Sequence, residues 1–323
     1  MQSVPSQRSA NDPPAAQEAA DLGPRSRLPP GLQVAAAAVE SLRPHQWLKN
    51  LLVFVPLAAA HKIANPALLG LGTRTFVAFS LCASGIYLLN DLHDVEADRA
   101  HPHKRFRPIP SGRLPRGLAI ALTPVLLVAA CLIALALGPD VLAALLVYQI
   151  LTAAYTFRLK AIVLLDAFAL ATGYALRVCA GALAVDIAPS AQLLAFCVFL
   201  FLSLALLKRY AELSLLGLRD GPTAHARGYL IGDQDFVLAL GISCGALSVL
   251  VLALYFGTTG ADQTHVRAQL TWVTCVLLLY WISYMWLRAR RGQMTDDPLV
   301  FAIKNRVSLG LLSLVAVTAW LAV

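Results

Sequence analysis

Long runs of apolar residues alternate with short polar segments along most of the chain. Residues 117–157 include one charged side chain, Asp140, whereas residues 187–207 and 268–287 include none. About 20 apolar residues in a helix cross the hydrocarbon core of a bilayer once. The pattern predicts an all-α, polytopic membrane protein with about nine transmembrane helices. The expected helices cover residues 46–61, 72–90, 117–137, 140–157, 161–184, 190–207, 235–256, 268–287 and 303–323.

The N-terminal segment lacks this alternation. Residues 1–30 are rich in Ala, Pro, Ser and Gln, with neither an apolar periodicity nor the hydrophobic core of a signal peptide. Such a segment cannot bury enough apolar surface to offset the entropy of ordering it. We therefore expect a disordered cytoplasmic tail at residues 1–30 and a single transmembrane domain at residues 31–323.

Composition and charge agree with insertion in a membrane. Hydrophobic residues make up 58% of the 323 residues and charged residues 14%, which excludes an ordinary soluble globule. The net charge of +8 would suit nucleic acid, but Lys and Arg are divided among loops, so no nucleic-acid partner is expected. Most of them fall in residues 91–116, 158–160, 208–227 and 288–306. The positive-inside rule places these loops and the N-terminus in the cytoplasm, in a multi-pass protein of the inner (plasma) membrane.

An acidic segment begins where the second expected helix should leave the membrane. If the helix continues, Asn90, Asp91, Asp94 and Asp98 fall within a sector of about 100° around the helix axis, on a single face. Three carboxylates and an amide oxygen would repel one another without a cation, and such hard oxygen ligands suit Mg²⁺. The phased spacing therefore predicts Asp91, Asp94 and Asp98 as magnesium ligands.

Basic residues follow the acidic segment at once. Their guanidinium and ammonium groups are donors suited to phosphate oxygens, so the segment predicts a magnesium–diphosphate site at the membrane surface. The alternative is a solvated connector whose Lys and Arg obey the positive-inside rule. That rule does not require the phased Asn and Asp spacing, which therefore favours the ligand site. The residues concerned are Arg99, Lys104, Arg105, Arg107 and Arg113.

Further polar residues lie at the cytoplasmic ends of other expected helices. Each has an alternative role as an ordinary membrane-flanking residue. The candidates for contact with phosphate are one of Lys49, Arg43 and Asn50, then Tyr155 and Lys160, and finally the cap residues Lys208, Arg209 and Glu212. Asp166 and Arg177 lie within one expected helix on a shared face, which indicates a wet interior. The loop at 288–306 is expected to be a solvated connector.

Together these residues resemble the UbiA-type superfamily of intramembrane prenyltransferases. The resemblance rests on N-D-x-x-D-x-x-x-D followed by R-P-x-x-S-G, and it extends over about residues 43–323. It implies nine helices around a central cavity open to lipid, with Mg²⁺ and diphosphate beneath cytoplasmic cap loops. The matching positions are Asn90, Asp91, Asp94, Asp98, Arg107, Pro108, Ser111 and Gly112.

The chain departs from the superfamily pattern at one place, and this departure indicates a particular branch. Most members carry a second Asp-rich motif after the sixth helix, where this chain has K-R-Y-A-E-L at residues 208–213. The chain is similar there, and in R-P-H-Q-W-L-K-N at 43–50, to the branch of decaprenyl-phosphate phosphoribosyltransferases. That branch implies transfer from phosphoribosyl pyrophosphate to a polyprenyl phosphate, with Asp91, Asp94 and Asp98 as catalytic metal ligands.

The resemblance also implies which residues bind the substrates. The expected set is Asn90, Lys49, Arg105, Arg107, Tyr155, Lys160, Lys208, Arg209 and Glu212. Two rival functions stay open: ordinary transfer of a prenyl chain to an aromatic or other acceptor, and non-enzymatic carriage of a lipid phosphate. The sequence leaves open whether the chain forms a homo-oligomer.

Overall fold

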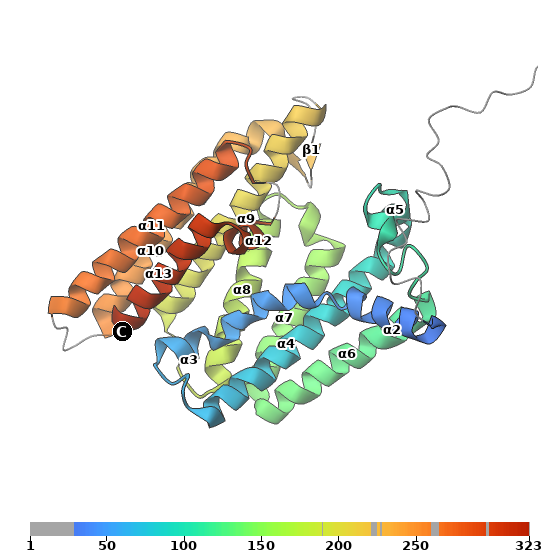
Figure 1. The fold of residues 1–323 in the computed structure, drawn as a ribbon, viewed down its shortest axis with the longest axis horizontal. Helices are drawn as coiled ribbons and strands as arrows, with labels where there is room; N and C mark the ends of the chain where they lie inside the picture. Colours follow the sequence, from blue (N-terminus) through green and yellow to red (C-terminus); the bar gives the residue numbers. More distant parts are fainter. Residues whose placement is uncertain are drawn as a thin grey trace, which may run out of the picture.

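The computed structural model describes residues 29–188, 190–220, 225–226, 228–259, 265–294 and 297–322. These residues are almost entirely helical (Figure 1). The tail expected at residues 1–30 lies outside the described residues up to position 28. The α-helices are α2 (Pro30–Ser41), α3 (Val55–Ala59), α4 (Pro66–His93), α5 (Val95–Ala100), α6 (Arg116–Leu137), α7 (Pro139–Phe157), α8 (Leu165–Ala184), α9 (Ala191–Asp220), α10 (Gln234–Thr259), α11 (His265–Arg290), α12 (Pro298–Lys304) and α13 (Arg306–Ala322).

Short elements connect these helices. They are the 3₁₀ helices η2 (Pro44–Phe54), η3 (Lys104–Phe106), η4 (Leu159–Ala161) and η5 (Ile231–Asp233), and the antiparallel pair β1 (His225–Ala226) and β2 (Tyr229–Leu230). The strand pair and α5 lie on the same side of the helical bundle (Figure 1).

Seven of the described helices are long and apolar enough to cross a membrane: α4, α6, α7, α8, α9, α10 and α11. The α12–α13 pair, bent by 91°, makes an eighth crossing if it counts as one span. A multi-span membrane protein is confirmed, whereas the expected count of nine is not. The expected span at 303–323 is broken because Asn305, between α12 and α13, is extended and its side chain accepts from Ser308 N.

The first expected span, residues 46–61, does not form one helix. Its residues belong to the 3₁₀ helix η2 and the five-residue α3. Pro56 has no amide hydrogen to bond the carbonyl one turn earlier, and this favours a break there. The segment instead packs closely on α8, since a Cβ on Gly181 would lie 2.0 Å from Val53 O.

Helix α8 joins two packed groups of helices. Its residues Ala167 and Ala171 belong to a core shared with α9, α10 and α11, while Ala180 and Ala184 belong to a core shared with α4, α6 and α7. Figure 1 shows α10, α11 and α13 side by side in one group, and α4 beside α6 in the other. Large apolar side chains such as Ile150, 70% exposed, face outward, as expected for a lipid-facing surface.

The loop after α5 folds back onto α2 and α4. Ile109 and Leu114 are fully buried against Leu88, and Arg113 forms a bidentate ion pair with Glu40 of α2 at 2.9 and 3.0 Å. Gly112 has φ +78°, a backbone conformation that residues other than glycine rarely adopt. The R-P-x-x-S-G segment is therefore a fixed turn that holds Arg107 over the acidic motif.

Candidate active site

The acidic motif spans a bend rather than one continuous helix. Helix α4 ends at His93, Asp94 occupies the break with φ −92° and ψ 10°, and α5 begins at Val95. The expectation that Asn90, Asp91, Asp94 and Asp98 share one helical face is wrong for this reason. Asp is a weak helix former, and the Asp94 carboxylate bonds two other side chains instead.

Asp91 lies at the centre of the motif and is 1% exposed. Arg43 Nη2 lies 2.6 and 2.8 Å from its two carboxylate oxygens, and Arg107 Nη1 lies 3.3 Å from Oδ1. Two guanidinium groups therefore compensate this buried charge. Such compensation is required because a lone buried carboxylate would be strongly unfavourable.

Asp98 is also buried, and it shares a partner with Asp91. Arg107 Nη1 lies 2.7 Å from Asp98 Oδ2, and Lys104 Nζ lies 3.8 Å from Oδ1. One guanidinium nitrogen of Arg107 thus joins the two carboxylates. The position between Asp91 and Asp98 is a site for positive charge.

Asp94 points to other partners. Its Oδ2 accepts from Lys160 Nζ at 3.2 Å, and its Oδ1 lies 2.8 Å from His93 Nδ1. Burial alone would raise the pKa of Asp94, but these hydrogen bonds and the positive charge of Lys160 lower the pKa below its ordinary value. Lys160 therefore contacts the acidic motif through Asp94, while its predicted role in binding a substrate phosphate stays a prediction.

Two predicted residues of this segment have other surroundings. Arg105 is exposed, and its guanidinium lies 4.8 Å from the centre of the Phe106 ring. Asn90 is half-buried, and its backbone carbonyl accepts from Asp94 N at 2.9 Å. Their roles in substrate binding stay predictions.

A second polar cluster forms around Asp297, which caps the N-terminus of α12. Its Oδ2 lies 3.2 Å from Lys208 Nζ and 3.6 Å from Lys49 Nζ. Burial would raise the pKa of Asp297, but the two lysines and the Leu299 amide hold the pKa below its ordinary value. The expected solvated connector at 288–306 is therefore wrong at Asp297, because this loop residue meets lysines from two distant segments.

Arg209 is held in a different direction from its neighbour Lys208. Its guanidinium, 2% exposed, donates to Asp166 and Glu212 and, at 3.3 Å, to the Tyr155 hydroxyl. Asp166 also accepts from the Tyr229 hydroxyl at 2.8 Å. The structure thus brings Tyr155, Arg209 and Glu212 together, in a buried network in which the guanidinium already has acidic partners.

Arg177 is buried within α8 and bonds neutral groups. It donates to Asn50 Oδ1 and the Tyr148 hydroxyl, both at 2.7 Å, and to Gly173 O at 2.6 Å. Asp166 and Arg177, expected to share one face of this helix, belong to two separate hydrogen-bond networks. Both charges are hydrogen-bonded inside the bundle, as charges in membrane helices usually are.

The motif fits a small, hard cation through two of its carboxylates. Within the part of the chain that the structure describes, no three His, Cys, Asp or Glu side chains converge closely enough to hold a metal ion. Asp91 and Asp98 nevertheless meet at one cationic nitrogen of Arg107, and Mg²⁺ is commonly held by one or two carboxylates together with substrate phosphates. The donor set therefore suits Mg²⁺.

Sequence reasoning missed the pairing of Arg43 with Asp91 and the contribution of Asp297. Arg43 belongs to the segment that contains Lys49, but its spacing gave no sign that it pairs with Asp91. Asp297 follows Lys208 by 89 positions and lies in a loop whose basic composition favours a solvated connector. A charged residue next to an expected membrane boundary is the signal that both share.

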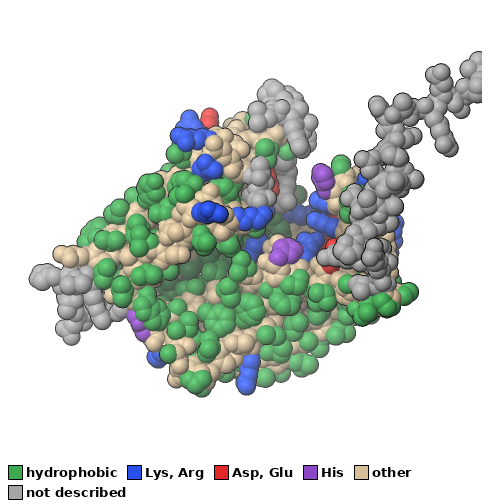
Figure 2. All heavy atoms as spheres, in the orientation of Figure 1, with side chains coloured by type: hydrophobic (Ala, Val, Ile, Leu, Met, Phe, Trp, Pro, Cys, Tyr) green, Lys and Arg blue, Asp and Glu red, His purple; other side chains and the backbone are tan. Residues whose placement is uncertain are grey.

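Basic and apolar surfaces meet on the face shown in Figure 2. Lys and Arg side chains gather along one margin of a hollow, and hydrophobic side chains cover the surface beyond it. Such a boundary suits a ligand with an anionic head and an apolar tail.

Residues 51–309 match the UbiA prenyltransferase family. The chain belongs to this family. Nodulation protein NoeC of Azorhizobium caulinodans is 35% identical over 270 residues, which cover 84% of this chain and 88% of that protein. Decaprenyl-phosphate phosphoribosyltransferase of Mycobacterium tuberculosis is 33% identical over 302 residues, covering 91% and 94%.

Another relative of this UbiA family member is longer. Protein y4nM of Sinorhizobium fredii is 36% identical over 281 residues, which cover 86% of this chain and 54% of that protein. The chain therefore spans about half the length of this relative. A UbiA homologue from Archaeoglobus fulgidus bound to GPP and Mg²⁺ has the same fold, with a TM-score of 0.65 and 17% identity over 88% of this chain and 96% of the homologue.

Proposed function

We propose that this UbiA family member transfers a phosphoribosyl group from phosphoribosyl pyrophosphate to a polyprenyl phosphate and releases pyrophosphate. The observation that carries the proposal is the cationic character of the second cluster. Lys208 and Lys49 share the single carboxylate of Asp297, and Glu212 is paired with Arg209. A site with surplus lysines suits an additional phosphate better than a second metal ion.

The relatives support the same reaction. The proposed substrates carry phosphate at three positions: the 5-phosphate and the diphosphate of the donor, and the phosphate of the lipid. They need more cationic groups than a prenyl diphosphate and an uncharged acceptor. The similarity to the phosphoribosyltransferase of M. tuberculosis extends over nearly the whole chain. NoeC is similar to the same degree, so the names of the relatives do not by themselves identify the acceptor lipid. We infer the acceptor from the site as well as from the names.

The first cluster is the proposed donor site. Asp91 and Asp98 would hold Mg²⁺, with Asp94 beside them. When bound, Mg²⁺ neutralises the negative charge that develops on the leaving pyrophosphate. Arg43 and Arg107, which bond the Asp91 carboxylate, are the nearest donors for diphosphate oxygens.

The bond changes require little proton transfer. The bond between ribose C1 and the pyrophosphate oxygen breaks, and a lipid phosphate oxygen forms a bond to C1. This nucleophile is already anionic at pH 7, so the reaction requires no strong general base. We place both clusters at the cytoplasmic side, in accord with the basic loops that carry them.

A comparison of two substrate pairs, offered in separate reactions, tests the proposal. The purified protein with Mg²⁺ is offered phosphoribosyl pyrophosphate and a polyprenyl phosphate in one reaction, and a polyprenyl diphosphate and an aromatic acid in another. We expect a new lipid product in the first reaction alone. A prenylated aromatic product in the second would instead support ordinary prenyl transfer, the alternative that the family name favours.

A further inference from the structure

The cluster around Asp297 joins three segments that are far apart in the sequence. Lys49 belongs to η2, Lys208 to α9, and Asp297 to the start of α12. One oxygen of Asp297 contacts both ammonium groups, while its Oδ1 accepts from Leu299 N at 3.1 Å. The carboxylate is thereby fixed to the helix end, and it fixes the two lysines in turn.

Positive charge exceeds negative charge in this cluster. Arg177 lies close enough to Lys49 for their charges to repel, and it donates hydrogen bonds to the neutral groups of Asn50, Gly173 and Tyr148. Two lysines therefore share the carboxylate of Asp297, and a third cation, Arg177, lies near Lys49. Partly buried charge of one sign is unfavourable unless a counter-charge is supplied, and a phosphate monoester supplies about −1.5 to −2 at pH 7.

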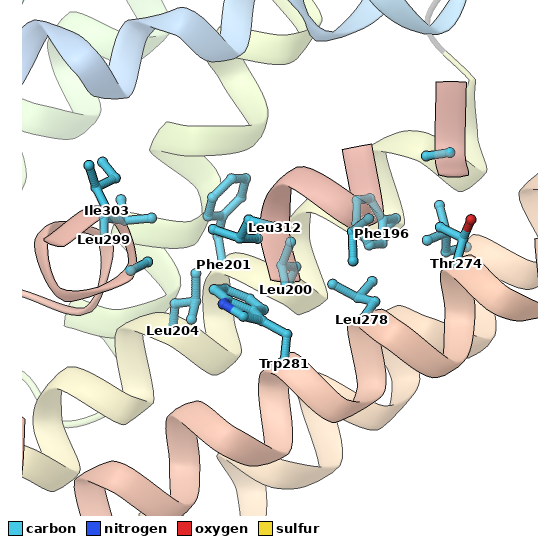
Figure 3. Close-up of a pocket in the computed structure, with 14 residues that line it drawn as sticks. Phe196, Leu200, Phe201, Leu204, Thr274, Leu278, Trp281, Leu299, Ile303 and Leu312 are labelled. Atoms are coloured by element: carbon cyan, nitrogen blue, oxygen red, sulfur yellow. The ribbon is translucent and has the colours of Figure 1, made fainter. Parts of the chain in front are cut away.

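An apolar cavity adjoins the cluster. Leu204, one helical turn before Lys208, and Leu299, two residues after Asp297, both line this cavity of about 400 Å³. Leu204, Leu299 and Ile303 lie at one end of it, with Phe196 and Thr274 at the other (Figure 3). Apart from Thr274, its lining consists of apolar residues. The polar cluster therefore marks one end of a space suited to a hydrocarbon chain.

We propose that Lys49 and Lys208, positioned by Asp297, bind the phosphate monoester of the lipid acceptor, and that the first part of its chain occupies the adjoining apolar cavity. The proposal rests on the proposed function for the claim that this lipid is a substrate. The 5-phosphate of the donor has the same chemistry, but only the lipid has a tail to fill the cavity. Binding is therefore the decisive property, and it can be measured without any transfer.

The test is equilibrium binding of a radiolabelled polyprenyl phosphate to the full-length protein in detergent, with no donor present. Unlabelled polyprenol, which lacks the phosphate, and ribose 5-phosphate, which lacks the tail, serve as competitors. We expect the wild-type protein to bind the lipid phosphate at least about tenfold more tightly than either competitor. Equal affinity for polyprenol would overturn the phosphate contact.

Lys208→Gln removes one proposed phosphate donor. We expect it to weaken lipid-phosphate binding about tenfold or more while polyprenol binding is unchanged, and we expect Lys208→Arg to restore most of the affinity. Lys62→Gln, which removes an exposed lysine between α3 and α4, is the matched control and should have no effect. If Lys208→Gln weakened ribose 5-phosphate binding alone, the site would belong to the donor and the proposal would be wrong.

Asp297→Asn separates positioning from simple charge. Asn still caps a helix well, so the start of α12 is retained, while the cluster becomes more positive. A positioning role predicts several-fold weaker binding of the lipid phosphate despite the added positive charge. Tighter binding would show that Asp297 merely competes with the ligand.

The outcome is separable from that of the proposed function. Normal lipid-phosphate binding without phosphoribosyl transfer would contradict the proposed reaction and leave this site standing. Phosphoribosyl transfer with unchanged lipid affinity in Lys208→Gln would overturn the site and leave the reaction standing.

Discussion

Arg43 and Asp91 are 48 positions apart, yet Arg43 Nη2 lies within 2.8 Å of both carboxylate oxygens of Asp91. Arg43 adopts φ 52°, in the left-handed region that non-glycine residues rarely occupy. Backbone strain of this kind costs about 1–3 kcal/mol and persists only where surrounding contacts enforce it. The ion pair thus fixes the segment before η2 against the acidic motif.

Arg43→Gln should impair both stability and activity. Asp91 would keep Arg107 as a partner but lose its nearer one, so we expect a loss of about 2 kcal/mol in the free energy of unfolding. We also expect kcat/KM to fall at least about tenfold, since Arg43 is a proposed diphosphate donor. Thermal unfolding in detergent and steady-state kinetics measure the two effects.

Arg113→Gln is the control for this variant. Arg113 also forms a two-point ion pair, with Glu40, but its side chain is 42% exposed. Exposed pairs contribute about 0–1 kcal/mol, so this variant should be much milder. Equal destabilisation by the two variants would show that burial of Asp91 is not what makes the Arg43 pair important.

Gly181→Ala should separate η2 from α8. The new Cβ would lie 2.0 Å from Val53 O, a backbone atom that cannot move without displacing the segment. Overpacking of this kind costs about 1–3 kcal/mol, and a lower Tm would report it. Gly310→Ala in α13, where no atom lies within 4 Å of the added Cβ, should leave Tm unchanged or slightly raised. Similar Tm values for both variants would contradict the close packing of η2 on α8.

The contribution of Asp297 to stability should not depend on pH near neutrality. Its pKa is lowered in the folded protein, because Lys49, Lys208 and the Leu299 amide outweigh the effect of burial. A lowered carboxyl pKa stabilises the fold above the unfolded value of about 3.9, and this contribution is lost as pH falls through the folded pKa. The Tm difference between wild type and Asp297→Asn should therefore be constant from pH 6 to 8 and shrink only in acid. A difference that changed between pH 6 and 8 would contradict this linkage, and Asp140→Asn, at an exposed position, is the control.

The apolar pattern was sufficient to predict the principal helices. The expected span 117–137 is close to α6, Arg116–Leu137, and the expected span 140–157 is close to α7, Pro139–Phe157. The breaks escaped prediction because hydropathy does not record local geometry. Residues 46–61 are apolar enough for a helix, but their 3₁₀ path depends on packing against Gly181.

The candidate site was predictable in composition but only partly in arrangement. The identities of Asp91, Asp98, Arg107 and Lys160 followed from the motif and from the membrane boundaries. Helical spacing could not foresee the bend at Asp94, which sends this carboxylate to Lys160. The pairing of Lys208 with Asp297 arises where separate helices pack together, so a local pattern carries no record of it.

The most direct test of the proposed reaction is the transfer of label from phosphoribosyl pyrophosphate to a lipid. The purified protein would be incubated with Mg²⁺, donor labelled in the ribose and decaprenyl phosphate, beside Asp98→Asn and the exposed-site control Asp140→Asn. We predict a labelled, lipid-extractable product with wild type and Asp140→Asn, which disappears with Asp98→Asn or on chelation of Mg²⁺ while the protein stays folded. No labelled lipid from the folded wild-type protein, or product formation that is indifferent to both Mg²⁺ and Asp98, would contradict phosphoribosyl transfer at this motif.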